Sequence, residues 1–386
     1  MTRALAALLV LTAACTNDVQ VGQPLRRVLD VPPDRPGALD VLFVIDPGTS
    51  ADAGAFFDEL QTRLGDSLPD LHVGVISSEL ARNAQPAGCD GEHNGALRAG
   101  DGTCTANGAR FLVDAASGNG LRVRNYDGAI GGAFACLADL PASTCSASQP
   151  MTALRVALGV DSLEGLPAAN QGFLRNDAML LVVVVSSRDD CSPDPLQPQF
   201  FSPGEFGSKP IAERCHDAQA KTDGPLVAPS AIADDVRALK RDPSMVMIAG
   251  VFAPPSGACA SNAEPGVRLS VLMGELPSRY AYASICDGGP ADQMRAIAHS
   301  VARVLGRSHC LLGPLPSHAA CRAYAETDLE QRSIPRCDAS TGGSCFTLGA
   351  SDSCSDTATG LDAEPTPRSV PAGAHFVVEC AAPPGL

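Results

Sequence analysis

Two continuous apolar stretches decide the fold of this chain. They are V-L-F-V-I at residues 41–45, which ends at Asp46, and M-L-L-V-V-V-V at residues 179–185, which ends at Ser186. Unbroken apolar runs of this length are typical of β-strands that are buried on both faces of a parallel sheet. Apolar residues at helical spacing follow the first run, within residues 53–68. Because buried strands alternate with helices, we expect an α/β fold with a doubly wound, mostly parallel sheet.

The alternating pattern continues over residues 38–309, which we expect to form one domain. Gly-rich and Pro-rich insertions interrupt it after residue 89 and after residue 192. The apolar positions of the helix at 291–305 fall on one stripe, as in a helix that packs on a sheet. Further strands are expected at 72–76, 109–113, 245–252 and 280–285, and further helices at 128–140, 151–158, 230–241 and 291–305.

The N-terminus has the pattern of an exported lipoprotein. A short basic segment precedes eight apolar residues at 4–11, too few to span a bilayer. The sequence L-T-A-A-C, ending at Cys15, resembles the lipobox of bacterial lipoproteins. The resemblance implies a signal peptide over residues 1–14 and acylation of Cys15 by chains such as palmitate. Ordinary signal cleavage after Ala14 is the alternative.

Residues 15–37 are polar and contain four prolines, so we expect them to form a tether between the lipid and the folded domain. Several acyl chains would hold the protein at a membrane surface without a membrane-spanning segment. Thr16 follows the cysteine, where some bacteria place an aspartate for retention in the inner membrane. The expected location is therefore the cell envelope, at the outer membrane.

The cysteine count supports export. If Cys15 carries lipid, fourteen of the fifteen cysteines remain, an even number that predicts seven disulfides. The simplest pairing joins neighbours in the sequence, namely Cys89–Cys104, Cys136–Cys145 and Cys191–Cys215. Zinc is the competing explanation, but the chain has no C-x-x-C pair. Six cysteines fall between residues 310 and 380, so we expect residues 310–386 to form a small tail that disulfides hold together.

The charge excludes one class of partner. The chain has 28 basic and 43 acidic residues and a formal net charge of −15. A surface so acidic repels phosphate backbones and anionic lipid headgroups. We therefore expect no nucleic-acid partner, and membrane contact only through the N-terminal lipid.

Polar residues gather where the two decisive strands end. Residues 46–50 read D-P-G-T-S, and residues 186–192 read S-S-R-D-D-C-S. In an open parallel sheet, ligands bind beyond the carboxyl ends of the strands, where the strand order reverses. Carboxylates and hydroxyls in such a crevice suit magnesium, calcium or manganese.

The stretch V-L-F-V-I-D-P-G-T-S at residues 41–50 resembles the first strand and the D-x-S-x-S metal motif of von Willebrand factor type A domains. The resemblance covers about residues 38–310 and implies a Rossmann-like fold that binds other proteins, often through a metal ion that a carboxylate of the partner completes. It assigns a divalent cation (Mg, Ca or Mn) to four residues: Asp46, Ser50, Thr144 and Asp189. Exported bacterial lipoproteins built on that domain resemble this chain at residues 71–77, 124–126, 172–175, 181–192 and 284–287.

Three positions depart from the family pattern. Gly48 replaces the first serine of the motif, and Ser187 stands where the family usually has an aspartate. Arg188 brings a positive charge close to the expected cation. Asp46 and Ser50 also fit a second interpretation, in which they only cap the following turn and helix.

Catalytic motifs are weak in this sequence, and we expect no enzyme. G-D-S-L at residues 65–68 spells the nucleophile block of a lipase and esterase family, but Ser67 follows a helical pattern instead of a buried strand. No P-loop, H-E-x-x-H or dinucleotide-binding motif occurs. The sequence therefore predicts a non-catalytic envelope lipoprotein that binds a protein ligand at the cell surface. The alternatives are a structural envelope protein whose site is lost, and a hydrolase.

Overall fold

The computed structural model describes residues 25–381, apart from short internal stretches. The stretches left out are 34–35, 66–67, 81–87, 90–93, 101, 118–120, 141, 162, 198, 203–207, 220–223, 257–258, 260–262, 307, 312–314, 316–319, 339–342, 355–356 and 358. The predicted signal peptide, the lipidation site Cys15 and Ser67 of the G-D-S-L block lie outside the described residues.

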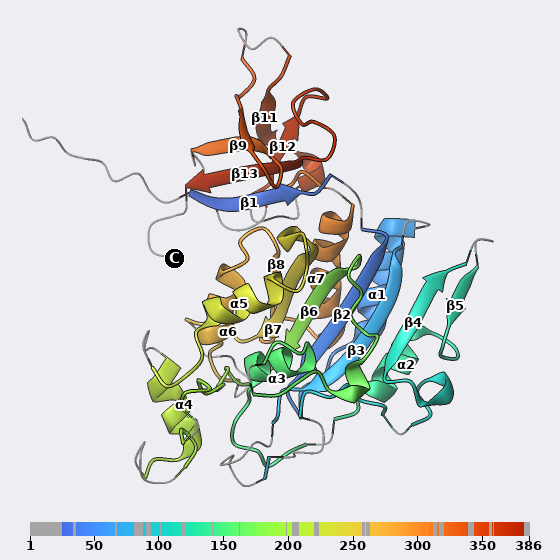
Figure 1. Ribbon diagram of the computed structural model, residues 1–386, viewed down its shortest axis with the longest axis vertical. Coiled ribbons are helices and arrows are strands. Elements are labelled where there is room, and N and C mark those ends of the chain that lie inside the picture. The colour runs from blue at the N-terminus through green and yellow to red at the C-terminus, as the bar shows by residue number, and fades with distance from the viewer. Residues whose placement is uncertain are drawn as a thin grey trace, which may run out of the picture.

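A seven-stranded sheet forms the centre of the larger unit (Figure 1), in the order β5-β4-β3-β2-β6-β7-β8. Strands β3, β2, β6, β7 and β8 are parallel to one another, whereas β4 runs antiparallel to β3 and β5 runs antiparallel to β4. This arrangement confirms the expected α/β class with a mostly parallel sheet. The strands are β2 (Ala38–Ile45), β3 (Asp70–Ser77), β4 (Phe111–Ala116), β5 (Arg122–Arg124), β6 (Met179–Val185), β7 (Val246–Phe252) and β8 (Tyr280–Ser284).

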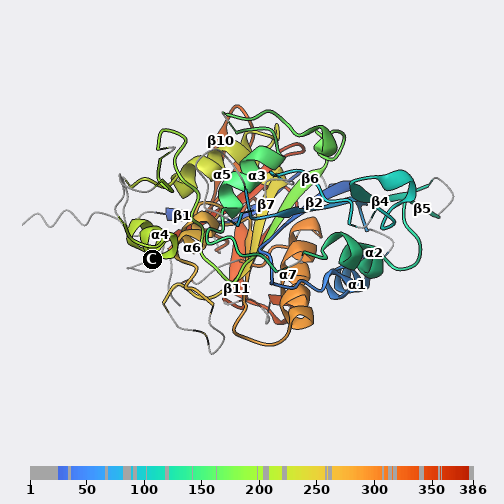
Figure 2. The same cartoon turned by 90° about the horizontal axis from the view of Figure 1, so that it is seen from below.

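Helices cover both faces of this sheet (Figure 2). One face carries α1 (Ala53–Leu64), α2 (Ile130–Leu137) and α7 (Pro290–Leu305), and the other carries α3 (Pro150–Ala157), α5 (Pro229–Arg237) and α6 (Val267–Gly274). A further helix, α4 (Ile211–Gln219), belongs to the insertion after β6.

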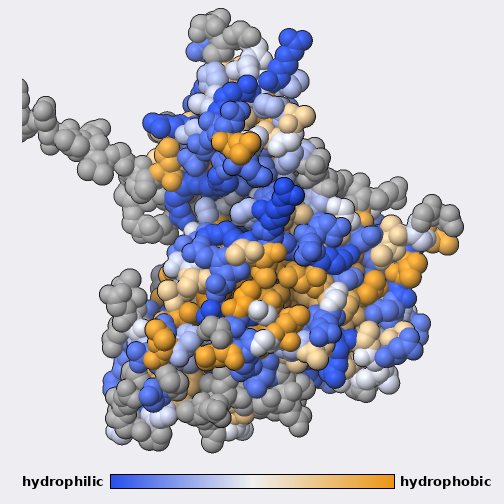
Figure 3. Space-filling model, in the orientation of Figure 1, coloured by the Kyte–Doolittle hydropathy of each residue, from blue (hydrophilic) through white to orange (hydrophobic). Residues whose placement is uncertain are grey.

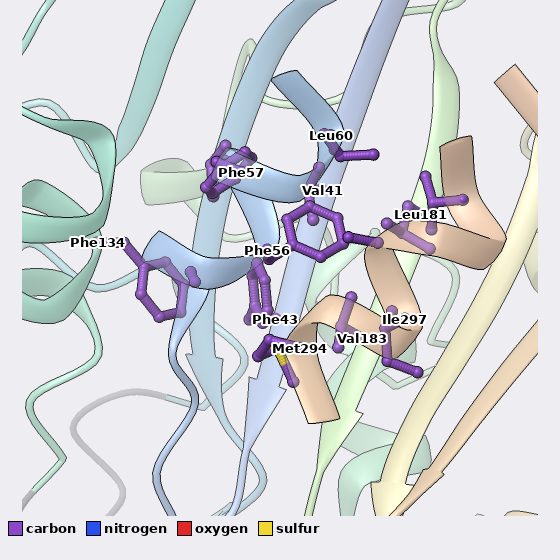
Figure 4. Packing of buried hydrophobic residues seen from close by; sticks show 14 of the residues in the cluster. Val41, Phe43, Phe56, Phe57, Leu60, Phe134, Leu181, Val183, Met294 and Ile297 are labelled. Carbon is purple, nitrogen blue, oxygen red and sulfur yellow. The ribbon is translucent and has the colours of Figure 1, made fainter. Parts of the chain in front are cut away.

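Alternate residues of the central strands feed two separate cores. Val41 and Phe43 of β2 face α1, α2 and α7, whereas Leu42 faces the other set of helices. The Phe43 ring lies 6.1 Å from that of Phe56 and 4.6 Å from that of Phe134, between centroids (Figure 4). Because a strand points successive side chains to opposite faces, a continuous apolar run is what a sheet covered on both faces requires.

The smaller unit is built from both ends of the described chain. Its four-stranded sheet has the order β1-β13-β9-β10, and a two-stranded sheet pairs β11 with β12. Its strands are β1 (Leu25–Val31), β9 (Cys321–Glu326), β10 (Gln331–Ile334), β11 (Phe346–Ala350), β12 (Leu361–Pro365) and β13 (His375–Ala381). We call this assembly the terminal β unit.

Strand β1 corrects the expected tether. Leu25–Val31 pairs antiparallel with β13 instead of forming a linker, and Val28, Leu29 and Val31 are buried in the core of the terminal β unit. That core also contains Phe346 and other apolar residues of the tail, so the tail is packed as well as disulfide-bonded. On the face in Figure 3 the surface of this unit is mostly hydrophilic, and apolar residues gather over the middle of the larger unit.

The terminal β unit lies at the amino ends of the parallel strands, away from their carboxyl ends (Figure 1). The Arg279 side chain, which precedes β8, donates to the backbone oxygen of Asp30 in β1. His375 at the start of β13 bridges the two units, with Nδ1 2.8 Å from Asp30 and Nε2 3.1 Å from Asp242 of the larger unit. The carboxyl ends of the parallel strands are therefore left to the loops.

The structure pairs all fourteen remaining cysteines, but only one of the three expected neighbour pairs is correct. Cys191–Cys215 is confirmed, whereas Cys89–Cys104 and Cys136–Cys145 are wrong. The four cysteines pair instead as Cys89–Cys145 and Cys104–Cys136. The other bonds are Cys259–Cys286, Cys310–Cys354, Cys321–Cys380 and Cys337–Cys345.

No helix within the described residues is long and apolar enough to cross a bilayer.

The bridge through His375 predicts a loss of stability in alkali. Burial disfavours the charged imidazole, but its hydrogen bonds to Asp242 and Asp30 raise its pKa from 6.5 to about 9. The charged bridge therefore stabilises the fold fully below pH 6.5, and this stabilisation is lost as pH rises through about 9. We expect His375→Gln to lower the free energy of urea unfolding by about 1–3 kcal/mol at about pH 6, and by much less at about pH 10.

The control for this prediction is His216→Gln, on the exposed surface of α4, which should leave the free energy of unfolding unchanged. An equal effect of His375→Gln at both pH values would contradict the charged bridge.

Candidate functional site

The ends of β2 and β6 meet at one place, as the two apolar runs predict, and the end of β3 lies beside them. Strands β2 and β6 are paired in register, with Ile45 opposite Val185, and the Asp46 N–H donates to the Val185 oxygen at 2.9 Å. On the other side of β2, the Ser78 N–H donates to the Ile45 oxygen at 3.0 Å. The loops after β2, β3 and β6 therefore share one site, at the point where the strand order reverses.

Asp46 is the centre of this site and is completely buried. The guanidinium of Arg188 contacts both carboxylate oxygens: Nη2 lies 2.5 Å from Oδ1 and Nε lies 3.0 Å from Oδ2. The Ser78 hydroxyl donates to Oδ1 at 3.0 Å, and the Ser187 hydroxyl donates to Oδ2 at 3.4 Å. Paired contacts of this kind fix both the position and the orientation of an arginine.

Arg188 is itself held from three sides. Its Nη1 donates to the Cys145 oxygen at 2.6 Å, and its Nη2 lies 3.5 Å from Oε1 of Glu79. Burial opposes the positive charge, but the hydrogen bonds and charge of Asp46, with the charges of Glu79 and Glu264, raise the pKa of Arg188. The side chain remains 23% exposed, so Arg188 is only partly removed from solvent.

Glu79 places a second carboxylate beside this pair. Its side chain is 3% exposed, and burial raises its pKa, against a hydrogen bond from Ser143 and the attraction of Arg188. Arg188 Nη2 lies 3.5 Å from Oε1 of Glu79 but only 2.5 Å from Oδ1 of Asp46, so Arg188 is primarily the partner of Asp46.

The structure does not bring the four expected cation ligands together. Asp46 is at the centre, but Ser50 and Thr144 are exposed. In the first loop it is the Thr49 hydroxyl that turns inward, donating to the Asp46 backbone oxygen at 2.5 Å. Asp189 points away from Asp46 toward helix α6.

Asp189 has a structural role at the start of α6. Its carboxylate accepts the N–H of Arg268 at 3.0 Å and of Leu269 at 3.2 Å. Burial raises its pKa to about 6, against these backbone hydrogen bonds. The neighbouring Asp190 accepts the N–H of Met151 in α3 and pairs with the Arg268 side chain at 3.1 Å. Both carboxylates after Arg188 therefore hold helices.

A divalent cation does not fit the site as the side chains are arranged. Both oxygens of Asp46 face a guanidinium, and a cation at those oxygens would lie against a positive charge. Within the described part of the chain, no group of three or more His, Cys, Asp or Glu side chains is arranged to hold a metal ion.

Sequence reasoning missed Ser78 and Glu79. Both follow β3, a strand that the sequence predicts. The polar residues of S-S-E-L at residues 77–80 lie at the carboxyl end of β3, as the polar loops after β2 and β6 lie at the carboxyl ends of their strands. The signal was therefore present, but a polar residue after a strand is too common to single out without its neighbours.

A hollow of about 720 Å³ opens beside the first loop. Thr49, Ser50 and Arg98 line it, together with Asp139 and Leu140 near the end of α2. Ser50 thus contributes to a concave surface next to Asp46 and not to a coordination shell.

Four disulfides brace the loops that follow the carboxyl ends of the parallel strands. We call this end of the sheet, with its loops, the carboxyl edge. Cys89–Cys145 ties the segment after β3 to the loop before α3, and Cys191–Cys215 anchors the insertion after β6. Cys259–Cys286 joins the segments after β7 and β8, and Cys104–Cys136 joins the segment before β4 to α2. The irregular chain at this edge is therefore covalently restrained.

No protein-family model matches this chain, and no curated protein is similar enough to count as a match.

The pairing of Asp46 with Arg188 predicts strong energetic coupling. Arg188→Met leaves a buried carboxylate without its counter-charge, and we expect a loss of about 3 kcal/mol in the free energy of unfolding. Asp46→Asn should also destabilise, but the double variant should cost clearly less than the sum of the two single variants. Urea unfolding of the four proteins measures this coupling, and additive effects would contradict the ion pair.

Proposed function

We propose that this protein is a lipid-anchored protein of the cell envelope whose α/β domain, of the von Willebrand factor type A kind, binds another protein through the carboxyl edge. The binding is non-catalytic and does not use a metal ion. The observation that carries this proposal is the bracing of the carboxyl-edge loops by four disulfides, one of which, Cys104–Cys136, borders the open hollow.

Rigid loops favour recognition because a binding surface that is already ordered loses less conformational entropy when the partner arrives. Binding residues are commonly carried on loops that a rigid scaffold positions. Here the scaffold is the central sheet, and the exposed Ser50, Thr144 and Glu264 lie on loops at its carboxyl edge. The terminal β unit lies at the amino ends of the parallel strands and leaves this edge open.

The disulfides also support a place outside the cytoplasm, because reducing compartments keep thiols free. Seven bonds in a chain of 386 residues suit an exported protein. The sequence pattern that ends at Cys15 supports the two remaining parts of the proposal, which are lipid on Cys15 and anchoring at the outer membrane.

The chemistry at the carboxyl edge supports binding over catalysis. Asp46 is neutralised by Arg188, Asp189 is occupied by α6, and Cys215 is in a disulfide, so none of the three is a free nucleophile or base.

The proposal predicts that charge changes at the carboxyl edge abolish binding. Ser50→Arg with Glu264→Arg alters two exposed residues of the edge and leaves the residues Asp46 and Arg188 themselves unchanged. On intact cells, we expect a partner protein to crosslink to the wild-type chain and not to this variant. Mass spectrometry of the crosslinked product identifies the partner. The purified partner should then bind the variant at least tenfold more weakly, a loss of about 1.4 kcal/mol.

The matched control is Asp328→Arg with Leu329→Arg, which raises the net charge equally on an exposed turn of the terminal β unit. This variant should retain the partner. Loss in both variants, or in neither, would argue against the carboxyl edge, and the absence of any specific partner would favour a structural role.

A further inference from the structure

The oxygens around Arg188 form a set that normally surrounds a metal ion. Two carboxylates, of Asp46 and Glu79, and the carbonyl oxygen of Cys145 accept from its guanidinium or lie against it at 2.5 to 3.5 Å. The hydroxyls of Ser78 and Ser187 donate instead to the Asp46 carboxylate. Carboxylate, hydroxyl and carbonyl oxygens are the ligands that hard divalent cations prefer.

Burial favours a cation beside the Asp46 carboxylate. Asp46 is fully buried, and an ionised carboxylate without a counter-charge is very costly in a protein interior. Among the described residues, Arg188 is the only basic side chain that forms an ion pair with Asp46. The need for positive charge is therefore met by the chain itself.

Connectivity gives Arg188 the geometric role of a metal ion as well. Through its contacts it joins the end of β2 at Asp46, the segment after β3 at Glu79 and the loop before α3 at Cys145, while its own backbone follows β6. Four segments that are distant in the sequence thus converge on one charged group.

We infer that Arg188 is the built-in cation of this site, that it makes the carboxyl edge independent of divalent metal ions, and that its removal exposes a latent site for such an ion on Asp46 and Glu79. The inference deepens the proposed function. Only its statement about partner binding rests on that function, whereas the statements about Arg188 and the latent metal site do not. A partner that docks here would do so equally in the presence of a chelator.

Thermal unfolding of the purified chain tests this inference without any partner. The melting midpoint is measured in EDTA and in millimolar Mg²⁺, Ca²⁺ or Mn²⁺ for the wild type, Arg188→Ala, and the double variant Asp46→Asn with Arg188→Ala. The wild-type midpoint should be the same in all four solutions. Arg188→Ala should melt several degrees lower in EDTA and recover at least half of that loss in one or more of the metals, because a bound ion stabilises the folded state.

Two controls isolate the effect. The double variant should show no recovery with metal, because the carboxylate ligand is gone. Arg175→Ala removes an arginine that contacts the equally buried Asp40 on the same strand, with Nε 2.8 Å from Oδ1. It should lower the midpoint and show no recovery with metal, because two further basic side chains, His72 and Lys240, each lie 3.8 Å from that aspartate.

A metal-dependent rise in the wild-type midpoint would overturn the inference, since the site would then already hold an ion. Equal behaviour of Arg188→Ala and the double variant in metal would also overturn it. So would an Arg188→Ala chain that fails to refold in every metal as well as in EDTA, because the oxygens would then be unable to hold an ion in place of the guanidinium. None of these results depends on whether the carboxyl edge binds a protein.

Discussion

The buried carboxylate of Asp46 is the constraint on which the carboxyl edge depends. It sits at the end of the central strand β2, where the strand order reverses and three loops meet. A charge at such a depth must be neutralised, and Arg188 does this with two contacts while it also binds the loop before α3. The ion pair therefore connects the stability of the sheet to the position of the loops that are proposed to bind a partner.

The two ends of the sheet have different roles. At the amino ends of the parallel strands, the terminal β unit docks through Arg279 and the His375 bridge, and β1 joins the start of the described chain to its last strand. At the carboxyl ends, loops and insertions are held by disulfides rather than by regular structure. Closing one end and leaving the other open is the arrangement of a scaffold that presents a single surface.

Most of the central sheet could be predicted from the sequence, because its signals are local. The run at Met179–Val185 is a strand with the expected bounds, and the helix expected at 291–305 is α7, Pro290–Leu305. The pairing of Leu25–Val31 with β13 leaves no local pattern in the sequence, because the two strands lie about 350 residues apart and prolines flank the first, which favours a tether. Two disulfide pairings failed for the same reason, since distance along the chain does not give distance in space. At the site, Asp46 and the nearness of Arg188 were predicted, but the direction of Asp189 and the presence of Glu79 depend on how the loops fold.

The central claim is that a guanidinium occupies the place of a metal ion beside Asp46. A crystal structure of the mature chain grown with manganese chloride, with anomalous data collected, tests it most directly. The account predicts that Arg188 covers both oxygens of Asp46 and that no anomalous peak lies within coordination distance of that carboxylate. A manganese peak at Asp46, with Arg188 turned out to solvent, would contradict it.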